Sequence, residues 1–175
     1  MIQPSDDEIV FYTNPMSRGR IARWMLEEIG RPYRTVLLDF GTTMKAPEYL
    51  AINPMGKVPA ILHGDTVVTE VAAICAYLAD AFPKAGLAPP PGDKARGPYF
   101  RWLFFAAGPL EAAVGDRFSA ADVYVGSQIM WGLQFKSLPD RDAFTAYAER
   151  LSRREAAGRA RAIDDALIAE AQAGG

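Results

Sequence analysis

Residues 12–24 read Tyr-Thr-Asn-Pro-Met-Ser-Arg-Gly-Arg-Ile-Ala-Arg-Trp and connect a predicted strand to a predicted helix. The strand is expected over residues 8–13, and Asn14-Pro15 ends it. The first N–H groups of a helix lack intrahelical partners and the peptide dipoles add at that end, so this turn is a potential anion site. Ser17 can add a hydroxyl that holds a thiolate or another small anion by a charge-assisted hydrogen bond.

The rest of the first half alternates strand and helix patterns. Apolar residues at helical spacing lead from the turn to Gly30, which stands where a C-terminal cap belongs. The next elements are expected to be a strand over 33–38, one helical turn over 47–50, strands over 58–62 and 67–69, and a helix over 70–82 with Thr69 as its N-cap. The order β-α-β and then β-β-α predicts an α/β thioredoxin-like N-terminal domain over residues 1–83.

The second half predicts an all-α helical C-terminal domain over residues 94–175, after a stiff proline-rich linker at 84–93. Ser119 and Asp122 form a capping box, which is typical of a helix start. Helices are expected over 94–107, 119–132 and 140–155, before an alanine- and arginine-rich tail. The arginines near the end predict a solvated face balanced by acidic residues: Arg150, Arg153, Arg154, Arg159 and Arg161 with Asp164, Asp165 and Glu170.

Composition excludes several classes of protein. A net charge of −2 gives no electrostatic footprint for nucleic acid. No apolar run is long enough to span a bilayer and no basic signal region precedes the first strand, so a cytoplasmic protein is expected. Cys75 is the single cysteine and His63 the single histidine, which excludes a disulfide, a Cys-x-x-Cys centre and a metal cluster. We expect Cys75 to be a buried inert thiol and His63 to lie in an exposed turn.

Four motifs stand in order around the linker: Asn14-Pro15-Met16-Ser17-Arg18-Gly19-Arg20 with Trp24-Met25-Leu26-Glu27-Glu28, then Asn53-Pro54-Met55-Gly56-Lys57-Val58-Pro59, then Thr69-Glu70 opening a helix that ends Ala76-Tyr77-Leu78, and Asp116-Arg117-Phe118-Ser119-Ala120-Ala121-Asp122-Val123. With them the chain resembles the cytosolic glutathione S-transferase family, in its bacterial serine-type, yeast-GTT-like branch. The resemblance implies a detoxification enzyme that joins reduced glutathione, its co-substrate, to small hydrophobic electrophiles. It implies a homodimer and no permanently bound cofactor.

The resemblance also implies a glutathione site. Val58-Pro59 would be a cis bond that offers the backbone N–H and C=O of Val58 to the peptide ligand, as in β-augmentation. Glu70 would accept from the γ-glutamyl ammonium. Lys45 and Lys57 would meet the glycine carboxylate, unless they are ordinary surface lysines. The electrophile pocket would be lined by Met16, Trp102 and Phe105, unless the two aromatic residues pack in the core.

Ser17 is the preferred thiol-activating hydroxyl. A free thiol titrates near a pKa of about 8.5, so full ionisation at neutral pH needs roughly 2.7 kcal/mol. A hydrogen bond to a charged group contributes about 1.5–3 kcal/mol and a helix N-terminus about 0.3–1 kcal/mol, which together suffice without a general base. Tyr12, at the end of the first strand, is the rival and Asn14 a third candidate, while Ser17 as a mere N-cap is the simplest alternative.

The chain departs from the resemblance in two places. Val71 stands where the family has a serine or threonine that contacts the γ-glutamyl carboxylate, so only its backbone N–H remains. Between Leu110 and Asp116 the family continues a long helix and adds another, which predicts a shortened helical domain, a shallower pocket and a less secure dimer. These departures keep open a non-catalytic glutathione-binding or interaction module. A glutaredoxin-like reductase is disfavoured because no cysteine stands at the first helix terminus.

Overall fold

The computed structural model of the protein describes residues 7–107, 118, 120–138 and 141–173. A four-stranded mixed sheet in the order β2-β1-β3-β4 organises the first half. The central strand β1 (Ile9–Thr13) pairs in parallel with β2 (Tyr33–Leu37) and antiparallel with β3 (Ala60–His63), which forms a hairpin with β4 (Thr66–Thr69). This is the thioredoxin-like arrangement that the order of strands and helices predicts.

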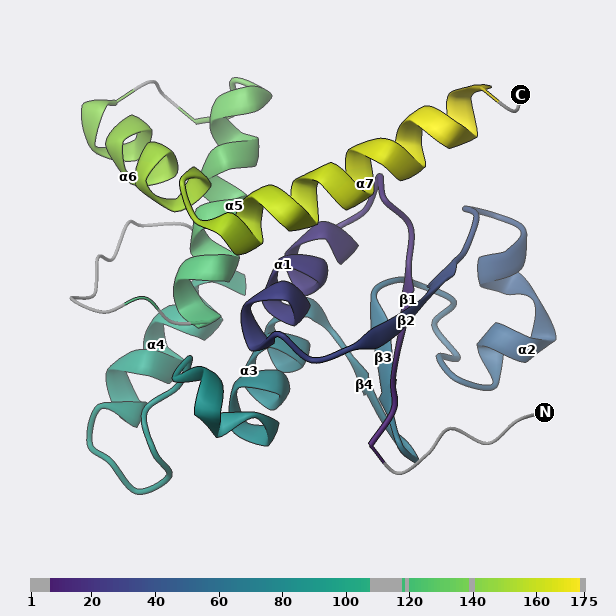
Figure 1. The fold of residues 1–175 in the computed structure, drawn as a ribbon, viewed down its shortest axis with the longest axis horizontal. Coiled ribbons are helices and arrows are strands. Elements are labelled where there is room, and N and C mark those ends of the chain that lie inside the picture. The colour runs from purple at the N-terminus through teal and green to yellow at the C-terminus, as the bar shows by residue number, and fades with distance from the viewer. Residues whose placement is uncertain (1–6, 108–117, 119, 139–140, 174–175) are drawn as a thin grey trace.

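Helices cover both faces of the sheet. α1 (Gly19–Ile29) and α3 (Val71–Ala81) lie on one side, and the 3-10 turn η1 (Thr43–Lys45) with α2 (Pro47–Leu50) lies on the other (Figure 1). Side chains alternate along β1 as a strand requires. Ile9 and Phe11 belong to the large core with α1 and α3, whereas Tyr12 packs against a smaller cluster of Leu38, Met44 and Tyr49. The two faces of β1 therefore serve separate cores.

The described part of the second half is helical. After the 3-10 turn η2 (Pro83–Ala85), it consists of α4 (Arg96–Ala107), α5 (Ala120–Gln134), α6 (Asp142–Ser152) and α7 (Glu155–Ala173). α5 contacts α1, α3, α4 and α6, and α7 lies across α1 (Figure 1). One cluster of buried apolar side chains runs from the sheet into these helices, so both halves share a core. None of the helices in the described ranges is long and apolar enough to cross a membrane.

The start of α3 differs from the sequence prediction. Thr69 is not the N-cap. That position belongs to Glu70, whose φ is 65° and whose side chain makes no capping hydrogen bond. The strand predicted from Val58 begins at Ala60, because the cis Val58-Pro59 bond precedes it. The predictions for Ser119 and for the segment between Leu110 and Asp116 lie outside the described residues.

The predictions for individual polar residues are partly confirmed and partly wrong. Cys75 is fully buried and burial raises the pKa of its thiol to about 12, which confirms an inert cysteine. The prediction of an exposed His63 is wrong, because its Nδ1 lies 2.8 Å from the Tyr77 hydroxyl and its side chain is only 15% exposed. The solvated arginine face is also wrong in part. Arg154 and Arg159 bind carboxylates of α1, and Asp164 is buried.

Candidate functional site

Two loops and the residue Glu70 lie at one end of the sheet, and the strand register explains why. Tyr12 of β1 lies opposite Ala60 of β3, which lies opposite Thr69 of β4. The C-terminal ends of β1 and β4 therefore flank the N-terminal end of β3. The loop that carries Ser17, the loop that carries Val58-Pro59 and the residue Glu70 follow or precede these strand ends directly. The sheet thus gathers residues from three separate motifs.

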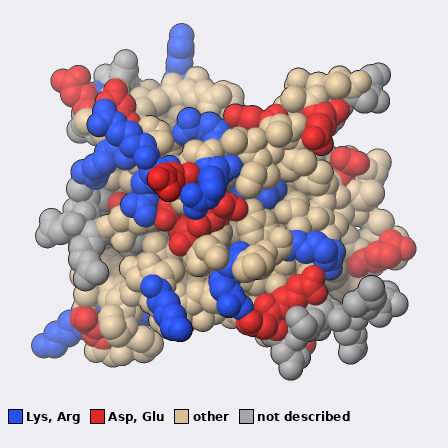
Figure 2. Space-filling model, in the orientation of Figure 1, with Lys and Arg blue, Asp and Glu red and all other residues tan. Residues whose placement is uncertain are grey.

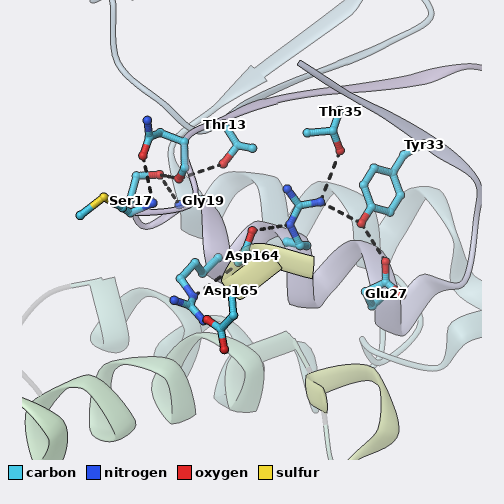
Figure 3. A network of polar contacts seen from close by, with 12 residues as sticks. Thr13, Ser17, Gly19, Glu27, Tyr33, Thr35, Asp164 and Asp165 are labelled. Carbon is cyan, nitrogen blue, oxygen red and sulfur yellow. Dashed lines mark hydrogen bonds and ion pairs between the residues drawn. The ribbon is translucent and has the colours of Figure 1, made fainter. Parts of the chain in front are cut away.

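The Ser17 loop is held by its own polar groups (Figure 3). The Ser17 hydroxyl donates to the Asn14 carbonyl at 2.6 Å and accepts from the Gly19 N–H at 3.0 Å. The Asn14 side chain accepts from the Met16 N–H at 2.9 Å and donates to the Leu38 carbonyl at 2.9 Å, which ties the loop to the end of β2. The hydroxyl of Ser17 is consequently fixed beside the first N–H groups of α1.

Gly19 lets α1 approach β1 at this point. A Cβ atom on Gly19 would lie 1.9 Å from the Thr13 Oγ1 atom and 3.0 Å from the Ser17 Oγ atom. Thr13 is itself buried, so its hydroxyl has little room to withdraw. A glycine is needed here for close contact rather than for an unusual backbone angle. The sequence pattern did not single out this pair.

Tyr12 and Asn14, the alternatives to Ser17, make different contacts. The Tyr12 ring lies 5.6 Å from the Tyr49 ring on the α2 side of the sheet. Burial raises the pKa of Tyr12, so its phenol ionises less readily than a free one. Asn14 uses both ends of its amide within the loop described above. The geometry favours Ser17 as the hydroxyl at the helix terminus.

The segment before β3 is a loop held by hydrogen bonds from side chains. The Lys57 carbonyl accepts from the Tyr49 hydroxyl at 2.5 Å and from the Asn53 side chain at 2.7 Å. Lys45 Nζ donates to the carbonyls of Gly56 at 2.9 Å and Met55 at 3.2 Å. Lys45 is therefore partly engaged in holding the loop, while the Lys57 side chain is exposed. The Val58-Pro59 bond that follows is cis, as the resemblance implies.

Glu70 and Val71 stand at the start of α3. Glu70 is exposed and has a positive φ, which costs a non-glycine residue about 1–3 kcal/mol and is typical of functional sites. Glu70 is the N-cap residue of α3, so its carboxylate belongs to the N-terminal end of that helix. Val71 is buried, with 7% of its surface exposed, so its side chain packs in the core.

The residues predicted for an electrophile pocket lie in two parts of the structure, on α4 and in the loop before α1. The Trp102 and Phe105 rings meet edge to face at 5.6 Å on α4. Met16 lies in the loop before α1 and is 73% exposed. Tyr124 of α5 is a residue that sequence analysis missed. Burial raises the pKa of Tyr124, the charge of Arg18 lowers it and the charge of Glu70 raises it. A tyrosine inside a helical pattern carries no sequence signal for this.

A buried ion pair on α1 was also missed. Arg23 Nε donates to Asp164 Oδ1 of α7 at 2.6 Å, and both side chains are at most 2% exposed. Arg23 Nη1 donates to the Tyr33 hydroxyl at 3.2 Å and to Thr35 Oγ1 at 3.3 Å (Figure 3). Burial raises the pKa of Asp164 while Arg23 lowers it. Since the partners are 141 residues apart, no motif spacing could have revealed the pair.

Comparison with known proteins shows which proteins this chain resembles. Residues 16–81 match the family described as glutathione S-transferase, N-terminal domain. Glutathione S-transferase GST-4.5 of Xanthomonas campestris pv. campestris is 33% identical over 94 residues, which cover 54% of this chain and 46% of that protein. This chain spans about half the length of the first curated relatives it matches.

Two solved structures extend the likeness across both halves. A glutathione transferase from Methylococcus capsulatus is 26% identical with a TM-score of 0.76, and the match covers 90% of this chain and 98% of the other. A glutathione transferase homologue from Sulfitobacter, solved with bound glutathione, is 25% identical with a TM-score of 0.73, and the match covers 90% and 97%. The gathered loops therefore lie in a domain with glutathione-binding relatives.

Proposed function

We propose that the protein is a glutathione S-transferase, which joins the thiolate of reduced glutathione to small electrophiles, because residues 16–81 match the N-terminal domain of that family. One observation carries the proposal. The Ser17 hydroxyl, the cis Val58-Pro59 loop and Glu70 converge at one end of the sheet. The Sulfitobacter relative with bound glutathione supports the choice of ligand. The specific serine-type branch belongs to the same proposal and rests on Ser17.

In this proposal Ser17 redirects its proton when the thiol binds. The hydroxyl hydrogen now points to the Asn14 carbonyl, and a small rotation would direct it to the sulfur instead. The thiol proton leaves to solvent, because the thiolate is stabilised by this hydrogen bond and by the N-terminus of α1. The sulfur then forms a bond to an electrophilic carbon, and a leaving group departs with its electron pair. The protein supplies ionisation and positioning.

The remaining contacts hold the tripeptide. The backbone of Val58 pairs with the ligand, and Glu70 accepts from the γ-glutamyl ammonium, with the N–H of Val71 beside it. Lys57 is exposed and free to meet the glycine carboxylate. Lys45 joins it through a remaining donor, since an ammonium has three and two point at loop carbonyls. Met16, Trp102 and Phe105 line the electrophile side. A homodimer, a cytoplasmic location and a role in detoxification stay predictions.

A non-catalytic glutathione-binding module of the same fold is the second candidate. The observation that favours it is Val71, whose buried side chain offers no hydroxyl to the γ-glutamyl carboxylate. Such a module would bind glutathione without lowering the pKa of its thiol. The two functions therefore differ in one measurable quantity.

The test is a titration of the protein with reduced glutathione, followed by the ultraviolet absorbance of the thiolate across pH. We expect saturable binding with an ionisation midpoint well below that of free glutathione, and a midpoint that returns towards the free value in Ser17→Ala. Tyr12→Phe is the matched control and should leave the midpoint unchanged. An unshifted midpoint in the unaltered protein would support the binding module, and no binding would contradict both candidates.

A further inference from the structure

The carbonyl oxygen of Asn14 is a shared acceptor at the turn that leads into α1. It accepts from the Ser17 N–H at 3.0 Å, which closes the turn from Asn14 to Ser17. It also accepts from the Ser17 hydroxyl at 2.6 Å and from the Thr13 hydroxyl at 3.4 Å. A carbonyl oxygen has two lone pairs, so the three donors compete for it. The Thr13 hydroxyl has the weakest share, because an O–H···O bond is normally about 2.7–2.8 Å long.

The Thr13 hydroxyl is buried beside this oxygen. Thr13 is the last residue of β1 and is 1% exposed, so its hydroxyl is shielded from water. The start of α1 closes over it, since a Cβ atom on Gly19 would lie 1.9 Å from the Thr13 Oγ1 atom. The long bond to the Asn14 carbonyl is the hydrogen bond that this hydroxyl donates among the described residues (Figure 3). Thr13 is therefore held next to an acceptor that Ser17 occupies.

Activation of a thiol at Ser17 changes this competition. In the proposed reaction the Ser17 hydroxyl turns from the Asn14 carbonyl to the sulfur, so the carbonyl loses its shortest hydrogen bond. Asn14 is only half-buried, yet the loss of a donor still raises the free energy of the thiolate complex. Thr13 is already within reach of the same oxygen and can shorten its bond as Ser17 leaves. The loss at Ser17 is then offset by a gain at Thr13.

Long-range charge gives a thiolate little help in this protein. The net charge of the chain is −2, which disfavours an additional anion. Basic and acidic side chains are intermixed over the face of the molecule shown in Figure 2, so their fields largely cancel at a distance. We therefore expect short-range hydrogen bonds, together with the N-terminus of α1, to set the ionisation of a bound thiol.

We propose that Thr13 is a positioning residue for thiol activation, whose hydroxyl takes over the Asn14 carbonyl when Ser17 turns to the sulfur. Thr13 and Ser17 each keep their own proton, and only hydrogen bonds are exchanged. The inference rests on the proposed function, because it requires a thiolate at Ser17. It adds a buried residue that acts through Asn14 and Ser17 rather than on the sulfur itself.

The test measures the ionisation midpoint of bound glutathione in Thr13 variants, by the ultraviolet absorbance of the thiolate. Thr13→Val keeps the branched shape and Thr13→Ala gives it up, and both lack the donor. We expect each to raise the midpoint by about half a pH unit to about one pH unit, the contribution of one neutral hydrogen bond. Thr13→Ser keeps the hydroxyl and should retain the midpoint of the unaltered protein. Thr13→Ala decides the matter if the added methyl group of Thr13→Val is too large beside Gly19.

S-methylglutathione separates this role from a purely structural one. It carries no thiolate, so Ser17 keeps its bond to Asn14, and the Thr13 variants should bind it as tightly as the unaltered protein does in calorimetry. Equal losses of affinity for both ligands would indicate a distorted loop and overturn the proposal. An unchanged midpoint in Thr13→Val and Thr13→Ala, beside a raised one in Ser17→Ala, would overturn it and leave the proposed function intact. A midpoint in the unaltered protein equal to that of free glutathione would overturn both.

Discussion

Helix α1 carries two polar centres that are built in opposite ways. At its N-terminal end, Ser17 and Asn14 bond to backbone groups of their own loop and of the adjoining strand end, and the site is only half-buried. In its middle, Arg23 bonds to Asp164 of α7, and both side chains are buried. Water can replace a lost partner at the first centre but not at the second. The first centre is therefore suited to exchanging partners with a ligand, and the second to holding helices together.

The strongest test of this contrast is removal of one partner of the buried pair. Asp164→Leu leaves the Arg23 guanidinium buried without a counter-charge, which we expect to lower the free energy of unfolding by about 3–5 kcal/mol. Urea denaturation measures it. The matched control is the double variant Arg23→Met with Asp164→Leu, which removes both charges and should recover most of the loss. A single variant as stable as the unaltered protein would mean that water reaches Arg23.

A second test addresses the close approach of α1 to β1. Gly19→Ala would bring its Cβ to 1.9 Å from Thr13 Oγ1, so the strand or the helix must shift. We expect a loss of about 1–3 kcal/mol in the free energy of unfolding, the usual cost of overpacking. Thr13→Ala in the same chain removes the clashing hydroxyl and should restore part of that stability. If the double variant gains nothing over Gly19→Ala, the strain arises elsewhere.

The two centres also differ in how far apart in the sequence their partners lie, and this explains which features the sequence could predict. The order of strands and helices along the chain and the Ser17 turn are set by residues close in sequence, and patterns such as Asn14-Pro15 followed by Ser17 encode them. The thioredoxin-like class was confirmed for this reason. The cap at Glu70 was missed because a positive φ in a non-glycine residue is imposed by the surrounding fold.

Long-range contacts account for the other failures. His63 stands beside a turn in the sequence, yet Tyr77 of α3 contacts its ring and covers most of it. In the sequence the arginines near the C-terminal end suggest a solvated face, but α7 packs across α1. Arg159 of α7 therefore meets Glu27 at 3.1 Å, and Arg154, which precedes α7, meets Glu28 at 2.8 Å. Charge patterns along one segment do not specify which element will cover it.

A third test probes the exposed centre by stability alone. Ser17→Ala removes the acceptor of the Gly19 N–H at the start of α1. We expect a loss of about 1 kcal/mol, the usual value for a capping side chain, because water can solvate the freed N–H. Ser17→Thr keeps the oxygen and should lose less. A loss as large as that of Asp164→Leu would contradict the contrast between a replaceable and an irreplaceable partner.

The smallest expected effect is the pH dependence of the buried pair. Burial raises the pKa of Asp164 above the value of 3.8 for a free carboxyl, and Arg23 opposes the shift. A carboxyl with a raised pKa binds its proton more tightly in the folded state than in the unfolded chain. Its contribution therefore favours folding below about pH 3.8 and is lost as the pH rises through the folded pKa.

Urea denaturation from about pH 3 to about pH 7 can isolate this term by comparison with Asp164→Asn, which does not titrate there. The unaltered protein should lose stability relative to Asp164→Asn as the pH rises, and only modestly, since Arg23 and Arg20 offset burial. A gain with rising pH would mean that the arginines outweigh burial, and that the ion pair itself stabilises the contact of α7 with α1.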